Sequence, residues 1–243
     1  MGQGDAILIQ SPDGKNALID GGEPNSGTLQ YLQIHGIKQL DLMIATHPHS
    51  DHIGGLVDIL LAIPVNRVVT NGQIYTSPTY EQFIDGIKKA KAIYSEVKQG
   101  DKIYFGDLDF YVLSPVSIQG NDLNENSLVL RLVYGKTSFL FMGDAGALTE
   151  GEILSSHITV QADVLKVGHH GSDSGSTPAF LSAVHPTIAI YMAGRKNDFG
   201  FPHLSTINNL KAIGAEIYGT DKNGTIIITS DGSLINVHTS ISK

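Results

Sequence analysis

Short apolar runs recur along the whole chain, and most of them end at Gly, Pro, Asn or Asp. This pattern is typical of buried β-strands that are separated by turns. We predict strands at Ala6–Gln10, Ala17–Asp20, Asp41–Thr46, Arg67–Thr70, Leu108–Leu113, Ser127–Val133, Ser138–Met142, Asp163–Val167, Ile188–Met192 and Thr225–Thr229. Between the strands, apolar residues recur at helical spacing. This spacing predicts helices near Gly27–His35, Ile53–Leu61, Thr79–Tyr94, Leu148–Ser155, Pro178–Ala183 and Ser205–Ile213.

The order of these segments indicates the fold class. Strict alternation of strands and helices is typical of one doubly wound sheet, whereas here strands often follow one another directly. The sequence therefore predicts an α+β fold with two packed sheets and helices outside them. No low-complexity linker divides the chain, so we expect residues 1–243 to form a single domain. Gly2-Gln3-Gly4 resembles a hairpin turn without its preceding strand, which suggests a domain cut from a longer polypeptide.

The composition of the chain argues against several classes of protein. The longest apolar stretches, such as Leu56–Val65, are interrupted before they reach the roughly 20 residues that cross a bilayer. The chain therefore offers no membrane segment of its own, and a membrane-bound parent protein stays open. The formal net charge of −8 argues against a general nucleic-acid coat, because such binding neutralises many phosphates with Lys and Arg. Without cysteine, any metal must be held by histidine, carboxylate or neutral oxygen.

The strongest chemical signal follows the predicted strand Asp41–Thr46. His47-Pro48-His49-Ser50-Asp51-His52 places three histidines and one aspartate within six residues. Crowded, partly buried imidazoles need compensation, and a divalent cation supplies it directly. An extended chain puts the rings of His47 and His49 on the same side, while Asp51 and His52 follow at the entry to a helix. Two pairs of ligands predict two divalent metal ions.

The spacing His-x-His-x-Asp-His resembles the signature of the metallo-β-lactamase superfamily. This resemblance implies a four-layer αββα sandwich of two mixed sheets. The segment Ala17–Gly22 is similar to the early strand of the superfamily, whose final aspartate, here Asp20, supports the site without binding metal. The segment Phe139–Asp144 is similar to the strand whose final aspartate, here Asp144, bridges the two metals.

Two later segments match the same resemblance. In Val164–Ser172, adjacent extended side chains point to opposite faces, so we expect one histidine to bind metal and the other to line the pocket. We take His170 as the ligand and His169 as the pocket residue. In the segment Phe201–Ser205, His203 resembles a late histidine that contacts the substrate or the second metal.

The chain departs from the family in two respects: no histidine lies between His52 and His157, and the late motif reads Gly200-Phe201-Pro202-His203 where the family often has Gly-His-Pro-His. Metal one is therefore expected to be held by His47, His49 and Asp144, with water, substrate or Asn126 completing it. Metal two is expected to be held by Asp51, His52, His170 and Asp144. Oxygen in place of an imidazole weakens the preference for Zn²⁺ and makes Mn²⁺ a suitable alternative.

Four segments look like the hydrolase domain of the ComEC competence family, the DNA-uptake channel proteins: Gly2–Ala6, Asn124–Ser127, Gly143–Ala145 and Gly168–Ser172. Membership in such a channel implies an extracytoplasmic location, and a free-standing hydrolase would be cytoplasmic or secreted. The resemblance favours DNA as the substrate. It also brings in a second kind of hydrolase, because phosphorylcholine esterases are similar in these motifs.

The predicted ligand set indicates the reaction. Two dications, two carboxylates and one bridging hydroxide leave a net charge of about +1, which favours an anionic phosphate ester. We expect the metal-bridging hydroxide to attack phosphorus. His169 or His203 would contact phosphoryl oxygens or protonate the leaving group, and Ser172 would donate a hydrogen bond. Asp51 would remain an ionised ligand.

Two alternatives are weighed against this nuclease or phosphodiesterase. A phosphorylcholine-ester or lactone hydrolase would need an aromatic or apolar side pocket, which Tyr75, Tyr80 and Phe83 would form. A non-catalytic binding module would be favoured by loss of an Asp or His from the main motif, and none is lost. The sequence thus predicts a dinuclear phosphodiester hydrolase.

Overall fold

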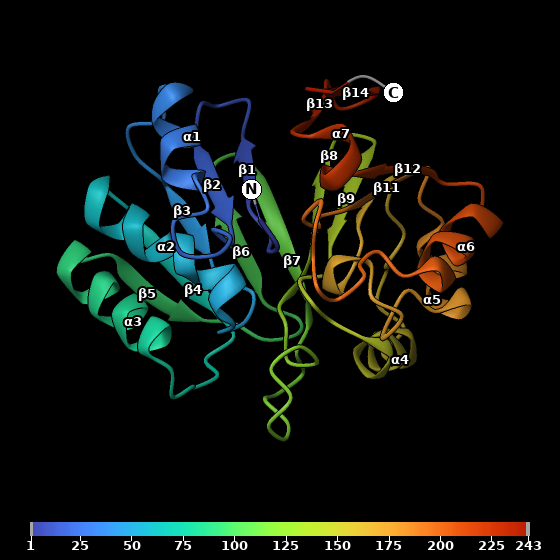
Figure 1. Ribbon diagram of the computed structural model, residues 1–243, viewed down its shortest axis with the longest axis horizontal. Helices are drawn as coiled ribbons and strands as arrows, with labels where there is room; N and C mark the ends of the chain where they lie inside the picture. The colour runs from blue at the N-terminus through green and yellow to red at the C-terminus, as the bar shows by residue number, and fades with distance from the viewer. Residues whose placement is uncertain (1, 242–243) are drawn as a thin grey trace.

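The computed structural model describes residues 2–241, which form two β-sheets with helices on their outer faces. The first sheet has the order β1-β2-β3-β4-β5 and is parallel except for the β1/β2 hairpin. Its strands are β1 (Ile7–Gln10), β2 (Asn16–Ile19), β3 (Leu42–Ile44), β4 (Arg67–Thr70) and β5 (Ile93–Glu96). The helices beside it are α1 (Thr28–Ile34), α2 (Ser50–Ala62) and α3 (Pro78–Ala90) (Figure 1).

The second sheet has the order β12-β11-β10-β9-β8-β7-β6, parallel from β12 to β9 and antiparallel from β9 to β6. Its strands are β6 (Lys102–Phe105), β7 (Leu108–Ser114), β8 (Val129–Tyr134), β9 (Thr137–Phe141), β10 (Val164–Lys166), β11 (Ile188–Tyr191) and β12 (Glu216–Gly219). Its helices are α4 (Ala147–Ser155), α5 (Pro178–Val184) and α6 (Leu204–Ala212) (Figure 1). A short helix α7 (Thr220–Asn223) and the hairpin of β13 (Ile226–Ser230) and β14 (Ile235–Thr239) complete the chain.

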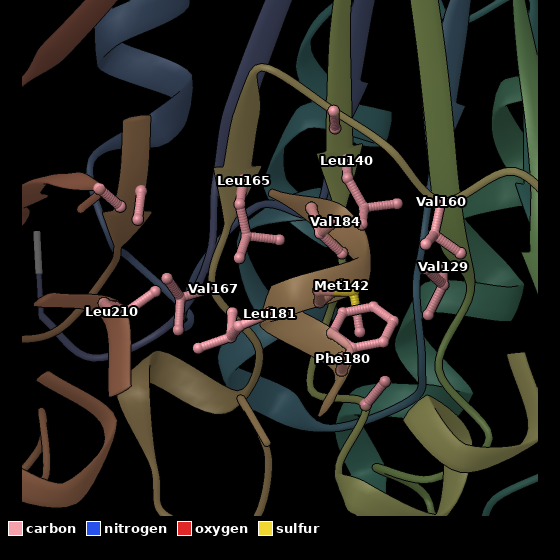
Figure 2. Packing of buried hydrophobic residues seen from close by; sticks show 14 of the residues in the cluster. Val129, Leu140, Met142, Val160, Leu165, Val167, Phe180, Leu181, Val184 and Leu210 are labelled. Carbon is pink, nitrogen blue, oxygen red and sulfur yellow. The ribbon is translucent and has the colours of Figure 1, made fainter. Parts of the chain in front are cut away.

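Three apolar clusters hold these layers together. One lies between α1–α3 and the first sheet, a second lies between the two sheets, and a third lies between the second sheet and α4–α6. Figure 2 shows the third cluster, in which Phe180 and Val184 of α5 face Leu140 of β9 and Leu165 of β10. Removing this apolar surface from water stabilises the sandwich, and the predicted α+β fold with two packed mixed sheets is confirmed.

Several predicted boundaries were wrong, and each error has a physical cause. The predicted helix Thr79–Tyr94 ends at Ala90, because Lys91 adopts a left-handed φ of 55° and the chain turns into β5. Strand β5 is mostly exposed at the sheet edge, so it lacks the apolar run that marks a buried strand. The sequence analysis did not predict strands β6, β12 and β14. Their residues are buried alternately or only in part, so these strands contain no continuous apolar run. Helix α2 begins at Ser50 rather than Ile53.

Candidate metal centre

The predicted ligands come together from three strand ends. His47, His49, Asp51 and His52 follow β3 and run into the first turn of α2. Asp144 follows β9, and His170 follows β10. Strands β9 and β10 are parallel neighbours, with Phe141 paired to Lys166, so their carboxyl ends meet at one edge of the second sheet. The two sheets thus contribute ligands to one cluster.

Asp144 lies at the centre of this cluster. Its Oδ2 is 3.3 Å from Nε2 of His52, 3.4 Å from Nε2 of His170 and 3.8 Å from Nε2 of His47. Asp51 approaches from the more exposed side, with its Oδ2 3.3 Å from Nε2 of His170 and 3.9 Å from Nε2 of His52. The other four side chains are buried. Two groups of potential ligand atoms, His47–His52–Asp144 and Asp51–His52–His170, lie close enough together to hold an ion, and they meet at His52.

The cluster contains buried polar atoms without partners, and these atoms test whether metal fits. Among residues 2–241, Nε2 of His52, Nε2 of His170 and Oδ1 of Asp144 are buried and make no hydrogen bond. Burying such groups unpaired is costly, and native proteins rarely leave them so. Lone pairs of imidazole and carboxylate that converge in this way are suited to a divalent cation. The residues present therefore fit metal binding.

His47 and His49 occupy the other side of the centre. Nε2 of His47, which faces Asp144, is also 3.0 Å from Nδ1 of His49. Burial, together with the nearby His52, lowers the pKa of His47 well below its usual value, so this ring is neutral and its nitrogen is free to bind metal. The structure places His47 beside Asp144 and His49 against His47. The group of ligand atoms that could hold one ion here contains His47, His52 and Asp144, so the assignment of His49 to metal one stays a prediction. His49 is the half-buried member of the set.

Asp20 fixes the orientation of His52, as its predicted supporting role requires. The backbone N–H of Thr46 donates to Asp20 Oδ1 at 2.8 Å, and the Thr46 hydroxyl donates to Oδ2 at 2.7 Å. The same Oδ2 is 2.8 Å from Nδ1 of His52. A carboxylate on Nδ1 leaves Nε2 of His52 as the metal-facing atom, the usual way in which proteins orient ligating histidines.

His170 has a similar support that the sequence analysis missed. Its Nδ1 is 3.0 Å from the carbonyl of Met192 and 3.3 Å from Oδ1 of Asp5, which is fully buried. Oδ2 of Asp5 is 2.5 Å from Nζ of Lys166, and that ammonium also donates to the carbonyl of Val167 at 2.8 Å. A lysine inside the apolar strand Val164–Val167 was the available signal, because a buried charge requires a partner.

Gly4 explains how Asp5 reaches His170. Gly4 adopts a φ of +111°, and a Cβ there would lie 2.1 Å from the carbonyl oxygen of Asp51. The backbone of this segment therefore packs directly against the metal-ligand loop, which only glycine permits. Gln3 adds a second tie, because its Oε1 accepts from the N–H of Gly194 at 3.1 Å. The segment Gly2–Ala6 thus forms one wall of the site.

The side chains of His169 and His170, which follow β10, point in different directions, but not for the reason expected from the sequence. His169 and His170 form a tight turn with positive φ values of 43° and 55°, so the chain is not extended there. The turn directs His170 into the cluster and leaves His169 half-buried beside it. Nδ1 of His169 is 3.0 Å from the hydroxyl of Ser174, and burial lowers the pKa of this ring. The argument from alternating strand faces was therefore wrong.

Two further predicted site residues hold loops beside the cluster. The hydroxyl of Ser172 accepts from the N–H of Ser174 at 3.2 Å. Nδ1 of His203 accepts from the N–H of Asp173 at 3.1 Å, and its Nε2 lies 3.2 Å from the carbonyl of Phe199. Both side chains are thus engaged in bracing the turns that carry them. Their contacts with substrate stay predictions.

Asn126 does not complete metal one. Its Oδ1 accepts from the N–H of Gln119 at 2.9 Å, and its Nδ2 donates to the carbonyls of Gln119 and Asp122 at 2.9 and 2.8 Å. The amide is therefore committed to the 119–122 loop, and the proposed metal contact is corrected to a loop-bracing role. The neighbouring Ser127 supports the site instead, because its hydroxyl accepts from the N–H of Asp144 at 3.1 Å.

The charges of the cluster predict that metal binding is coupled to proton release. Burial lowers the pKa of His52 and His170, yet the surrounding carboxylates, with Asp144 the strongest among them, together outweigh burial and raise the pKa of both rings well above the usual value. The metal-free protein therefore holds protons on both rings at neutral pH, and a cation must displace them. We expect apparent metal affinity to fall by up to about tenfold for each proton displaced and each pH unit below 7.

Calorimetric titration of metal into the metal-free protein, in buffers of different ionisation enthalpy, measures this release directly. A binding enthalpy that is independent of the buffer, with equal affinity at pH 6 and pH 8, would contradict the predicted coupling. Replacement of the exposed Asp85 by Asn provides a matched control, because this carboxylate contacts only Lys88 on the same helix.

Two sheets packed face to face, with helices outside and a histidine–aspartate cluster at the strand ends, define a class of metal-binding αββα proteins. The chain belongs to the metallo-β-lactamase superfamily, because the sequence model of this family matches residues 1–195. Members of this superfamily are mostly metal-dependent hydrolases.

The chain is 33% identical to ComE operon protein 3 of Bacillus subtilis, over 93% of this chain and 32% of that protein. It is 29% identical to competence protein ComA of Neisseria gonorrhoeae, over 93% of this chain and 30% of that protein. The resemblance to competence proteins is thereby confirmed, and the chain spans about a third of the length of these relatives.

Among solved structures, the metallo-β-lactamase fold protein YhfI of Bacillus subtilis matches 98% of this chain and 92% of its own, with a TM-score of 0.62 and 15% identity. At that identity the match supports the fold alone. Within residues 2–241, none of the helices has both the length and the apolar character needed to cross a bilayer.

Proposed function

We propose that this chain is a dinuclear metal-dependent hydrolase of phosphodiesters, with DNA as its substrate. The observation that carries the proposal is the position of Asp144 among three buried imidazoles, with unpaired atoms of His52 and His170 directed at it. Two divalent cations, Zn²⁺ or Mn²⁺, held by this cluster would supply an activated water nucleophile and positive charge beside the phosphoryl oxygens. The competence relatives support DNA over other phosphate esters.

The remaining roles belong to the residues around the cluster. Asp20 orients the buried ring of His52, and the Met192 carbonyl with nearby Asp5 orients that of His170, each with Nε2 inward, so the ligand geometry is set before substrate binds. Asp51 is the least buried carboxylate of the cluster, and nearby His170 and His52 keep its pKa low despite burial, so it remains ionised. His169 lies half-buried beside the cluster, and we assign it to a phosphoryl oxygen or the leaving group.

The phosphorylcholine-ester alternative lacks its predicted pocket. Phe83 is buried in the core between α1–α3 and the first sheet, and Tyr80 packs against that core. The cavity that both residues line with His47 has a volume of about 10 Å³, which holds no more than one water molecule. A trimethylammonium group therefore has no room there. The binding-module alternative would be favoured by a missing ligand, and every residue of the main motif is present in the cluster or beside it.

Metal-free protein reloaded separately with Zn²⁺ and Mn²⁺ tests the proposal against a substrate panel. The panel contains single-stranded and duplex DNA, bis(p-nitrophenyl) phosphate, p-nitrophenyl phosphorylcholine and a lactone. We expect metal-dependent cleavage of DNA and of the simple phosphodiester, and none with the metal-free protein. Turnover of only the lactone or the choline ester would contradict the assigned substrate class, and no turnover with either metal would favour the binding module.

A further inference from the structure

One exposed aromatic ring stands beside the metal centre. Of the eight phenylalanines in the chain, all within the described residues, only Phe199 has an exposed side chain, with 64% of its surface accessible. Its ring stacks on Phe201 at 5.4 Å and an interplanar angle of 12°. The ring of Phe201 in turn lies 5.4 Å from His169 and 6.0 Å from His170. The exposed face of Phe199 is therefore separated from a predicted metal ligand by a single ring.

The loop that carries Phe199 is held in place by side chains. Nδ2 of Asn197 donates to the carbonyls of Gly194 and Phe201 at 2.9 and 2.8 Å, and its Oδ1 accepts from the N–H of Phe201 at 2.8 Å. The carbonyl of Phe199 itself lies 3.2 Å from Nε2 of His203. These contacts hold the ring of Phe199 at a fixed place beside the metal centre, with its outer face accessible to a ligand.

Charge around the ring indicates the chemistry of that partner. The same loop exposes Arg195 and Lys196 beside a single carboxylate, Asp198, on a chain whose net charge is −8. Across the cluster, the ring of Tyr75 meets His49 edge to face at 6.4 Å. Aromatic rings next to basic side chains are the usual means of binding single-stranded nucleic acid, with bases stacked and phosphates neutralised. Duplex DNA keeps its bases stacked internally and offers no free face.

We propose that Phe199, supported by Phe201, is the platform on which a nucleobase of single-stranded DNA stacks while a neighbouring phosphodiester lies at the metal centre. This inference rests on the proposed function and adds to it the strandedness of the substrate and one residue that binds it. The contact is to the face of the base, so it is independent of sequence.

The test combines a protein variant with a base deletion. Cleavage of a single-stranded oligonucleotide is compared with that of a series in which a tetrahydrofuran replaces one nucleoside at each position. Loss of one base–aromatic stack lowers affinity by about tenfold, so Phe199→Ala should lower kcat/KM by about that factor, mainly through KM. The wild type should lose the same factor on one abasic oligonucleotide, and Phe199→Ala should lose nothing further on it. Phe199→Trp should restore cleavage.

The control is Tyr104→Ala, which removes another exposed aromatic ring, 70% accessible, from β6 at the sheet edge. We expect the kcat/KM of this variant on the single-stranded oligonucleotide to equal that of the wild type. The platform would be ruled out if Phe199→Ala cleaved the oligonucleotide as fast as the wild type. It would also be ruled out if the variant lost a further factor in kcat/KM on the abasic oligonucleotide. Either result would leave the proposed function intact. Absence of DNA cleavage by the wild type would instead count against the proposed function.

A binding measurement keeps the platform testable in that case as well. Metal-loaded protein is titrated into an oligonucleotide that carries 2-aminopurine, whose fluorescence is quenched by stacking. We expect quenching by the wild type and by Phe199→Trp, and a loss of most of it with Phe199→Ala. Equal quenching by the alanine variant, or none by the wild type, would overturn the proposal.

Discussion

Replacing Asp144 with alanine is expected to abolish hydrolysis by the metal-loaded protein while the fold stays largely intact. Within residues 2–241, Asp144 is the one carboxylate that lies within 4 Å of all three histidines His47, His52 and His170, so its removal breaks both predicted ligand groups at once. The loss is electrostatic and local, because this carboxylate contacts the imidazoles of the cluster. We expect turnover to fall by at least about a hundredfold and metal content to fall with it.

Metal analysis, turnover with DNA and thermal unfolding of the metal-free protein measure this outcome. Asp85→Ala is the matched control, because it removes an exposed carboxylate on α3 that pairs only with Lys88. Near-wild-type turnover of Asp144→Ala would exclude a mechanism with two metals joined at this residue. A variant that fails to fold without metal would show that Asp144 has a structural role as well.

Much of this site was predictable because its residues form a dense local pattern. The run from His47 to His52 contains most of the ligands, and Asp144 and His170 each close an apolar strand. Strand ends converge in a two-sheet fold, so local motifs were enough to place the cluster. The same reasoning failed at β5, because an edge strand buries little and carries a weak pattern.

The supports of the ligands could not be predicted in the same way. Asp5 and Lys166 lie far apart in the sequence and meet only when the first and second sheets pack together. The positive φ of His170 depends on the turn that the folded loop imposes, and no residue type encodes it. Bracing by Asn126 was equally hidden, since an asparagine beside a metal motif suits a ligand as well as a loop.

The most strongly destabilising single change predicted by the structure is Lys166→Met. Lys166 and Asp5 are both buried, and their side chains form an ion pair at 2.5 Å. Burial raises the pKa of Asp5, but Lys166 together with His170 and His52 outweighs burial and lowers that pKa, so the carboxylate is ionised in the fold. Removing Lys166 takes away the largest of these compensating charges, and breaking a buried pair in this way costs about 3–5 kcal/mol of unfolding free energy. Urea unfolding of the metal-free protein at pH 7 measures this loss.

The pH dependence and a second substitution distinguish charge from packing. With Lys166 removed, only His170 and His52 still oppose the effect of burial, so the folded pKa of Asp5 rises from its wild-type value. The variant is therefore penalised at neutral pH and recovers stability as falling pH protonates the carboxyl. The difference in unfolding free energy between Lys166→Met and the wild type should therefore become smaller below pH 5. Adding Asp5→Asn removes the buried charge and should restore most of the stability, whereas Lys88→Met on the exposed face of α3 should change it by less than about 0.5 kcal/mol. If the double variant is as unstable as Lys166→Met alone, the instability does not come from the buried charge of Asp5, and the predicted contribution of the ion pair is wrong.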